Sequence, residues 1–201
     1  PGRAARGVAA DAAAGHRVPV DRGFLVRRRA IGTQVVHPKV RRPVELTSLY
    51  DDLAASRKDP RTKVLSLGTV PATDRVAHAL GLEDGVEVLA MERLRYADGQ
   101  PLAIMRNWLP LGLVELDGGR LERAGLYQLM RAAGINLHLA SQTIGARGAS
   151  GAEARLLQAR KGEPLLTMSR TTYNENGLPV ELADHIYRAS LYTFEIVLVT
   201  R

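Results

Sequence analysis

The chain has 201 residues, 45% of them hydrophobic and 24% charged, which suits one soluble globular domain with at most a short appendage. It contains no cysteine, which excludes disulfides, thiolate metal ligands and a cysteine nucleophile, and fits a reducing cytoplasm. The apolar run at residues 196–199 is far shorter than the ~20 residues of a membrane-spanning helix, so we expect no membrane partner.

The formal net charge of +7 is unevenly spread along the chain. The first 43 residues carry 10 basic and 2 acidic residues, whereas the remainder carries 18 basic and 19 acidic ones. A basic appendage on a near-neutral body favours a polyanionic partner for the appendage.

Three segments are expected in chain order. Residues 1–20 have small side chains and no apolar periodicity, which predicts a disordered segment. Residues 24–36 contain two apolar runs on either side of a basic cluster and a glycine, which predicts a small basic hairpin. Prolines at 38 and 43 then indicate an extended linker, so we place a domain boundary there. The predicted division is 1–20, 21–43 and a body over 44–201.

The body alternates short helices with long strands. We expect helices over residues 45–55, 74–82, 126–133 and 152–159. We expect strands over residues 62–70, 86–96, 101–109, 135–146, 165–173, 179–189 and 193–200. Asp98-Gly99 and Asn176-Gly177 predict two hairpin turns, because these residues accept a positive φ.

The body also contains an internal repeat. Residues 89–96 (LAMERLRY) align with residues 166–173 (LTMSRTTY), and each segment is preceded by a helix and a glycine and followed by a glycine turn and a proline. Chance similarity of two amphipathic hairpins is the alternative. The repeat predicts an α+β fold in which two similar strand-helix-hairpin halves share one largely antiparallel sheet, with helices packed on it.

Catalytic and cofactor motifs are not found. The five histidines have no metal-ligand spacing, and the glycines form neither a nucleotide-binding loop nor a serine-hydrolase elbow. We therefore expect no metal site, no cofactor and no enzymatic activity.

Arg93 and Arg95 lie two residues apart on a predicted strand and so share one face of it. A pair of guanidinium groups on a sheet face is a plausible grip for a phosphate or a carboxylate. The alternative is that both side chains lie on the solvent face and pair with acids.

Glu181, His185 and Tyr187 share a face of a second predicted strand. Glu181 is placed to accept hydrogen bonds from ligand hydroxyl or amino groups, and Tyr187 to close the pocket. Solvated strand positions are the alternative for all three.

Thr47 and Ser48 begin a predicted helix whose free N–H groups are suited to an anion, although a plain helix cap explains them too. For Tyr127, packing of its helix on the sheet is the alternative to ligand contact.

The predicted basic hairpin brings together Arg27, Arg28, Arg29, Gly32 and Thr33. These residues suit contacts with a DNA phosphate backbone, which add salt-dependent affinity without base readout. A solvated charged surface is the alternative.

Together these segments resemble a known regulator family. Residues 21–36 (DRGFLVRRRAIGTQVV) resemble the end of the recognition helix and the wing of a GntR-family winged helix-turn-helix protein. Residues 46–53 (LTSLYDDL), 92–103 (ERLRYADGQPLA) and 179–188, from Pro-Val-Glu to Tyr-Arg, are similar to the UTRA effector-binding domain of the HutC subfamily.

The resemblance implies a chorismate-lyase-like fold, a homodimer and a small anionic effector, such as a sugar phosphate or an organic acid, that modulates operator binding. It implies that Arg93 and Arg95 hold the anionic group with help from Thr47 and Ser48. It places Tyr127, Glu181 and Tyr187 near the rest of the ligand. Met105 stands where several relatives have an acidic residue, which argues against an amino-sugar phosphate.

Three functions are therefore compared. The leading hypothesis is a ligand-sensing transcriptional regulator, most simply a repressor; a chorismate-lyase-like enzyme and a dimerisation module with a degenerate pocket are the alternatives. A complete DNA-binding domain needs a whole helix-turn-helix, and only its wing is identified in this sequence. We therefore expect no specific operator binding from these 201 residues alone.

Overall fold

The computed structural model describes residues 25–28, 32–35, 39–43 and 46–195. It divides into two units, Pro1–Lys39 and Val40–Arg201. The whole segment predicted to be disordered, 1–20, and the end of the predicted last strand lie outside the described residues.

The first unit contains the predicted hairpin. Strands β1 (Leu25–Arg28) and β2 (Gly32–Val35) pair in antiparallel fashion, with Arg27 opposite Thr33 and Arg28 opposite Gly32. The hairpin is thus confirmed for the backbone; the side chains of its arginines lie outside what the structure describes.

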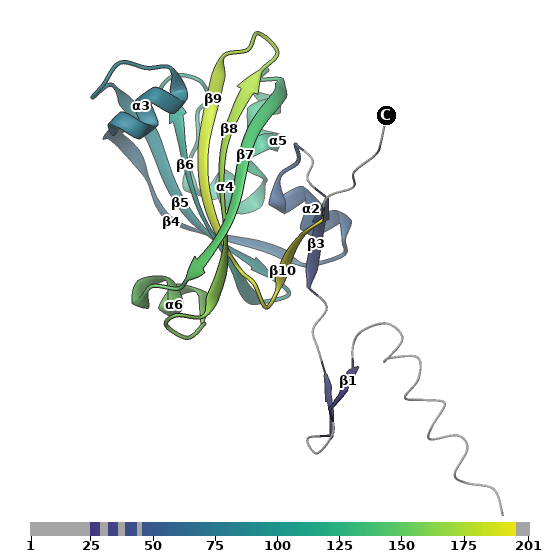
Figure 1. Ribbon diagram of the computed structural model, residues 1–201. Helices are drawn as coiled ribbons and strands as arrows, with labels where there is room; N and C mark the ends of the chain where they lie inside the picture. The colour runs from purple at the N-terminus through teal and green to yellow at the C-terminus, as the bar shows by residue number, and fades with distance from the viewer. Residues whose placement is uncertain (1–24, 29–31, 36–38, 44–45, 196–201) are drawn as a thin grey trace, which may run out of the picture. The chain divides into compact units, whose positions relative to one another are not determined.

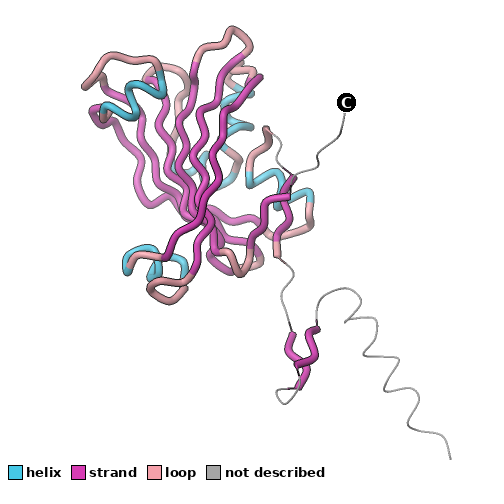
Figure 2. Tube along the Cα trace, in the orientation of Figure 1, coloured by secondary structure: helices cyan, strands magenta, loops and turns pink. Residues whose placement is uncertain are grey.

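The second unit is built on a six-stranded antiparallel sheet, which confirms the predicted fold class (Figures 1 and 2). Its order is β4-β5-β6-β9-β8-β7. The strands are β4 (Pro60–Pro71), β5 (Glu87–Ala97), β6 (Gln100–Pro110), β7 (Leu137–Gly148), β8 (Pro164–Asn174) and β9 (Pro179–Arg188).

The internal repeat is visible in this sheet. The first half runs β4, α3 (Asp74–Leu80), β5, β6, and the second runs β7, α6 (Gly151–Leu157), β8, β9. The bounds of β7, α6 and β8 each lie 77 residues after those of β4, α3 and β5. Since β6 and β9 are neighbours, the halves meet at the centre of the sheet, about a pseudo-twofold axis.

Both hairpin turns form as predicted. Asp98 and Gly99 have φ of 50° and 76°, the left-handed values of a tight two-residue hairpin loop. At the second turn Gly177 has φ of 75°, and the Asn174 side chain accepts hydrogen bonds from the amides of Asn176 and Leu178.

Each face of the sheet is covered by its own helices. Helices α3 and α6 cover opposite ends of one face, packing on Leu182 and on Ile104 and Ile186 (Figure 1). Helices α2 (Leu49–Ala55) and α5 (Leu126–Ala132) cover the other face, where Leu53 and Met130 are fully buried. In the described part of the chain no helix is long and apolar enough to span a membrane.

Two elements, α4 (Gly118–Arg123) and β3 (Val40–Pro43), were not predicted from the sequence, and the start of α2 was misplaced. Helix α4 was not predicted, because its first two residues are glycines that indicate a turn. Helix α2 begins at Leu49 rather than 45, because Ser48 caps it by accepting a hydrogen bond from the Asp51 amide at 3.1 Å.

The predicted linker is in part a strand. Strand β3 (Val40–Pro43) pairs in parallel with β10 (Tyr192–Glu195), which is as much of the predicted last strand as the structure describes. Linker composition alone did not reveal this pairing, because the partner strand is about 150 residues away.

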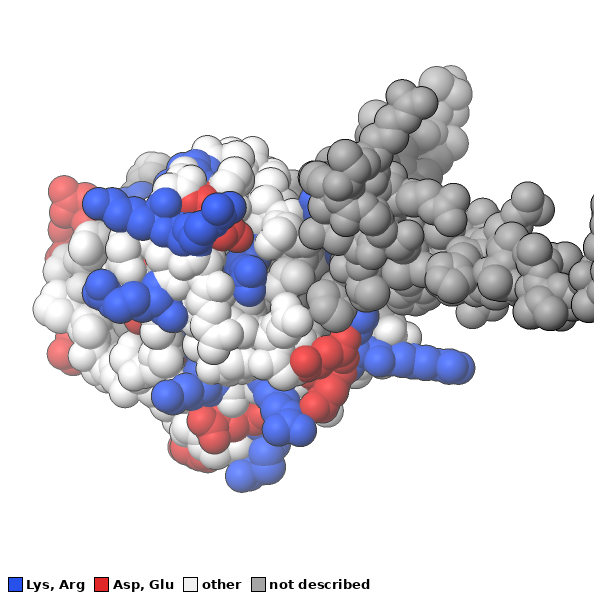
Figure 3. All heavy atoms as spheres, turned by 90° about the horizontal axis from the view of Figure 1, so that it is seen from below, with Lys and Arg blue, Asp and Glu red and all other residues white. Residues whose placement is uncertain are grey.

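Charges on the second unit are mixed. Figure 3 shows basic and acidic side chains interspersed on one face, in keeping with the 18 basic and 19 acidic residues after residue 43.

Candidate effector-binding site

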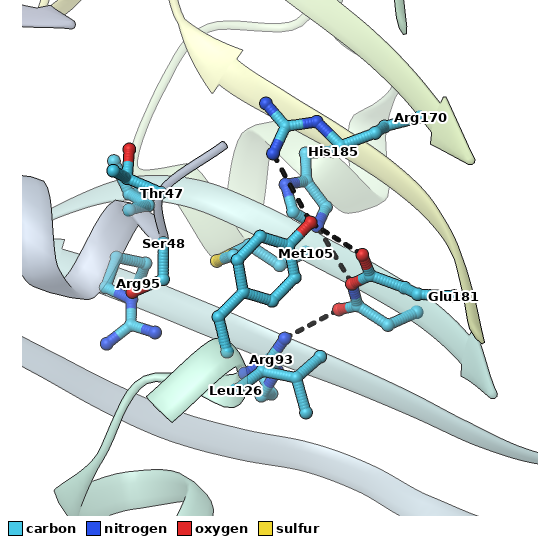
Figure 4. Close-up of a pocket in the computed structure, with 12 residues that line it drawn as sticks. Thr47, Ser48, Arg93, Arg95, Met105, Leu126, Arg170, Glu181 and His185 are labelled. Atoms are coloured by element: carbon cyan, nitrogen blue, oxygen red, sulfur yellow. Dashed lines mark hydrogen bonds between the residues drawn. The ribbon is translucent and has the colours of Figure 1, made fainter. Parts of the chain in front are cut away.

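A cavity lies between the sheet face and the first turns of α2 and α5. Its lining comes from both halves of the repeat and from both helices: Thr47, Ser48, Leu49, Arg93, Arg95, Met105, Asn107, Leu126, Tyr127, Arg170, Glu181 and His185. Figure 4 shows Thr47, Ser48 and Arg95 at one end of the cavity and Arg170, His185 and Glu181 at the other.

Arg93 and Arg95 are buried in the wall of this cavity. Each exposes 1% of its surface, so the prediction that they share a face holds and the solvent-face alternative is wrong. Among the described residues, no carboxylate lies within 4.0 Å of either guanidinium group.

The two arginines have only neutral partners. Arg93 Nη2 donates to Asn107 Oδ1 at 2.6 Å, while its Nε and Nη1 have no hydrogen-bond partner. Arg95 Nη1 donates to Thr62, its guanidinium lies 5.0 Å from the centre of the Tyr50 ring, and its Nε is unpartnered. Buried N–H groups of this kind are rare in folded proteins, so these donors are suited to hydrogen bonds with a bound anion.

The electrostatics agree with that inference. Burial lowers the pKa of Arg93 to about 10, although the charge of Glu181 opposes the shift. Burial, together with the neighbouring charge of Arg93, lowers the pKa of Arg95 to about 9. Both groups remain cationic at neutral pH, and neither forms an ion pair within 4.0 Å among the described residues.

Glu181 is held by neutral donors rather than by a cation. Asn107 Nδ2 donates to its Oε1 at 2.6 Å, and the hydroxyls of Tyr127 and Thr172 lie 2.7 and 2.9 Å from its Oε2. Because both oxygens are already used, Glu181 holds Asn107 and Tyr127 in place more directly than it offers an acceptor to a ligand.

Tyr127 connects this carboxylate to a third guanidinium. Arg170 Nη1 donates to the Tyr127 hydroxyl at 3.3 Å, and Arg170 Nε donates to Gln142 Oε1 at 2.7 Å. Burial and the nearby Glu181 raise the pKa of Tyr127 above its usual value, so the phenol stays a neutral hydrogen-bonding group.

His185 links the cavity to an aromatic cluster. Its Nε2 lies 3.2 Å from Asn107 Nδ2, and its Nδ1 lies 3.1 Å from the Tyr187 hydroxyl. The Tyr187 ring stacks on that of Tyr192 in β10, with centroids 4.2 Å apart. Tyr187 is fully buried behind His185 and does not line the cavity.

The ends of the two helices are in close contact beside the cavity. A β-carbon added at Gly125, the residue before α5, would lie 2.6 Å from Ser48 Oγ and 3.2 Å from Tyr50 Cβ. The free volume inside the cavity is about 20 Å³, roughly that of one water molecule.

Seven of the eight ligand residues suggested by the sequence line this one cavity, and the eighth, Tyr187, supports His185 from behind. The solvated-strand alternative is wrong for Glu181, His185 and Tyr187, which expose 1%, 7% and 0% of their surfaces.

Two polar lining residues were missed, and the sequence held a signal for each. Asn107 lies two residues after Met105 on the same strand face. Arg170 stands 77 residues after Arg93 and is its counterpart in the second half of the repeat. His185 similarly lies 78 residues after Asn107, and these two counterparts are in contact at the centre of the sheet.

Comparison with known proteins gives a consistent family. The profile of the UTRA domain matches residues 55–193. The transcriptional repressor NagR of Bacillus subtilis is 30% identical over 177 residues, which cover 87% of this chain and 73% of the relative. The transcriptional regulator Rv0792c of Mycobacterium tuberculosis is 34% identical, covering 88% of this chain and 66% of the relative.

Solved structures show the same architecture. PhnF from Mycobacterium smegmatis superposes with a TM-score of 0.81 at 26% identity, covering 92% of this chain and 82% of PhnF. A candidate transcriptional regulator from Streptomyces coelicolor has a TM-score of 0.68 at 53% identity, covering 72% of this chain and 97% of that protein. The chain therefore belongs to the UTRA-domain family, the effector-binding domains of GntR-family transcriptional regulators.

Proposed function

We propose that the cavity binds a small anionic metabolite through Arg93 and Arg95, and that binding modulates the affinity of the regulator for its operator. The observation that carries the proposal is the pair of buried guanidinium groups with unpartnered N–H donors and, within the described part of the chain, no carboxylate within 4.0 Å of either. Burying a charge without a counter-charge is costly, whereas charge-assisted hydrogen bonds to a bound anion are strong.

The rest of the cavity favours a ligand with an uncharged middle. Met105, between Arg93 and His185 in the strand register, forms an apolar wall together with Leu49 and Leu126. At the far end Arg170, His185 and Asn107 provide polar contacts. Three arginines and one glutamate line the cavity, which favours an anionic ligand such as a phosphate monoester or a dicarboxylate. Thr47 and Ser48 complete the anion end.

A thermal-shift screen tests this function. Inorganic phosphate, sugar phosphates, organic acids and fatty acids are added to the full chain, and a ligand at 100 times its Kd stabilises by about 2.7 kcal/mol. Arg93→Ala and Arg95→Ala are expected to abolish the shift, whereas Arg61→Ala, an exposed arginine of β4, retains it. Unchanged thermal shifts in both pocket variants would contradict the assignment of Arg93 and Arg95 to anion binding.

For the regulator as a whole we propose a repressor, as NagR and PhnF are named, and we further propose that it is homodimeric and cytoplasmic. Residues 21–43 would supply the wing and linker and 44–201 the effector-binding domain. Arg27, Arg28, Arg29, Gly32 and Thr33 would contact DNA phosphates, so operator affinity falls as salt rises.

An enzymatic role is the less favoured proposal, since the relatives are named as transcriptional regulators. Incubation with chorismate separates the two: turnover would replace the regulator proposal with a lyase.

A further inference from the structure

A second and larger hollow lies on the sheet face opposite to the candidate effector-binding cavity. Its free volume is about 300 Å³, which falls at the lower end of the range for small-molecule pockets. Residues of β6, β7, β8 and β9 line it. Successive residues of a strand point to opposite faces, so Asp184 and Ile186 of β9 face this hollow, whereas the side chain of His185 between them lies in the cavity.

Hydroxyl groups form part of the floor of the hollow. Thr143 on β7 is paired with Ser169 on β8, and Gly145 is paired with Thr167. The glycine leaves the Thr167 hydroxyl uncrowded, because a β-carbon at position 145 would lie 3.0 Å from Thr167 Oγ1. Within the described part of the chain, the hydroxyls of Thr143 and Thr167 form no hydrogen bond, so both can donate to and accept from a ligand.

The charged side chains in the lining are already paired. The pairs are Arg106 with Glu92, Arg147 with Glu153, and Asp184 with Arg75 of α3. An anion would therefore compete with a carboxylate for either guanidinium group. Arg93 and Arg95 differ, since neither forms an ion pair with a described residue. The hollow thus favours an uncharged ligand, unlike the cavity behind it.

The repeat indicates that the shared fold does not require this lining. In the first half, the counterparts of Thr167 and Ile186 are Ala90 and Trp108. The Trp108 ring lies under the Arg75 guanidinium, which is 5.8 Å from the ring centre. The second half therefore has a smaller aliphatic side chain where the first has an indole, and a hydroxyl where the first has a methyl group.

We propose that this hollow binds a small neutral polyhydroxy compound, a single sugar ring or a cyclic polyol, as a second ligand of the chain. Its hydroxyl groups donate to Asp184 and accept from Arg106 or Arg147 while the ion pairs stay intact. The buried Ile186 provides an apolar surface for the C–H groups of the ring. Because the two sites lie on opposite faces of β9, this inference does not depend on the proposed effector.

Heteronuclear NMR of the full chain tests the site with glucose, galactose, mannose and myo-inositol, and with inorganic phosphate as the anionic probe. At least one of the four neutral compounds is expected to move the amide signals of residues 143–147 and 167–169 in a saturable manner. Saturable changes at these residues with phosphate alone would overturn the choice of an uncharged ligand. The absence of saturable changes with all five probes would overturn the site.

Two glycines that are counterparts in the repeat give a matched pair of variants. Gly145→Val places its side chain against Thr167 and is expected to weaken binding of the neutral compound at least about tenfold. Gly68→Val, at the counterpart position on β4, is expected to bind as wild type does, because a β-carbon there has no atom within 4 Å. Equal affinities of the two variants would contradict the proposal.

Thr167→Val removes the hydroxyl with little change of shape, so it tests the site without filling it. We expect its affinity for the neutral compound to fall about fivefold. Both Gly145→Val and Thr167→Val are expected to keep the anion-induced thermal shift, since neither residue lines the cavity. Loss of that shift together with binding of the neutral compound would overturn the inference of a separate site. A wild-type chain that binds the neutral compound but no anion would overturn only the effector proposal.

Discussion

Arg93 is the residue on which the proposed binding site depends, and burial of its charge has a measurable cost. Arg93→Met keeps the length of the side chain and removes the buried charge, although Asn107 loses one donor. Replacing a buried charge by an apolar side chain of similar volume is often neutral or stabilising, so we expect the free energy of unfolding to stay within about 1 kcal/mol of wild type.

The same variant is expected to lose its stabilisation by the anion identified in the screen. Urea denaturation with and without that anion measures both effects, and Arg61→Met on the exposed part of β4 is the control. If Arg93→Met lowers the free energy of unfolding by several kcal/mol in the absence of anion, Arg93 stabilises the fold and is not reserved for ligand binding.

Glu153 gives a pH dependence at the residue scale. Its hydrogen bonds with Arg147, at 2.7 and 2.6 Å, lower its pKa to about 2, below the value near 4.3 expected for the unfolded chain. A lowered pKa in the folded state means that the carboxylate stabilises the fold fully above about pH 4.5 and loses this contribution as the pH falls toward 2.

Glu153→Gln is therefore expected to remove part of the fall in stability between pH 5 and pH 3. We expect the part to be about 1 kcal/mol, because Arg147 is 44% exposed and water screens the pair. Urea midpoints at the two pH values measure it, with the exposed Glu115→Gln as control. An unchanged pH profile for Glu153→Gln would contradict the assignment.

At the scale of elements, α2 and α5 meet in close contact beside the cavity. Gly125→Ala places a methyl group against Ser48 Oγ, which must rotate away and give up its cap on α2. Loss of a cap costs about 1 kcal/mol, so the urea midpoint is expected to fall.

Gly118→Ala is the matched control, because Gly118 also lies at a helix start but has no atom within 4 Å of the added carbon. We expect it to be neutral or slightly stabilising. Equal effects of the two substitutions would show that the contact between the helices is loose.

The elements themselves were largely predictable. Period-two alternation and two glycine turns gave the six long strands to within about two residues, and the 77-residue shift gave their grouping into halves. Helix α4 and the pairing of β3 with β10 were not predictable in this way, because one begins with glycines and the other depends on a distant partner strand.

The candidate site was predictable for a similar reason. Residues on one strand face are visible from spacing two, which found Arg93, Arg95, Glu181 and His185. Spacing did not reveal that Tyr187 lies behind His185, since depth within a face depends on packing by α2 and β10. Arg170 could be found only by comparing the two halves of the repeat, in which it is the counterpart of Arg93.

At the scale of the whole molecule, the cavity lining is connected through the chain to the paired strands β3 and β10. Thr47 and Ser48 follow β3 within a few residues, and β3 is paired with β10, whose Tyr192 stacks on Tyr187. Because the free volume is about that of one water molecule, we expect ligand binding to move the Thr47–Ser48 turn.

Hydrogen exchange is expected to register this movement. With the bound anion at saturation, amides of residues 46–53 should exchange more slowly than in the free protein, since new contacts order the turn, while amides of α6, on the other sheet face, stay unchanged. Equal protection of both segments with and without anion would exclude a binding-linked change in this turn.

The cavity lies where the two halves of the repeat meet, and this has a consequence for ligand specificity. Arg93 belongs to one half and its counterpart Arg170 to the other. In the proposed site, the two ends of a metabolite would therefore contact mainly different halves. Substitutions in one half would then alter the recognition of one end of the ligand and leave that of the other end unchanged.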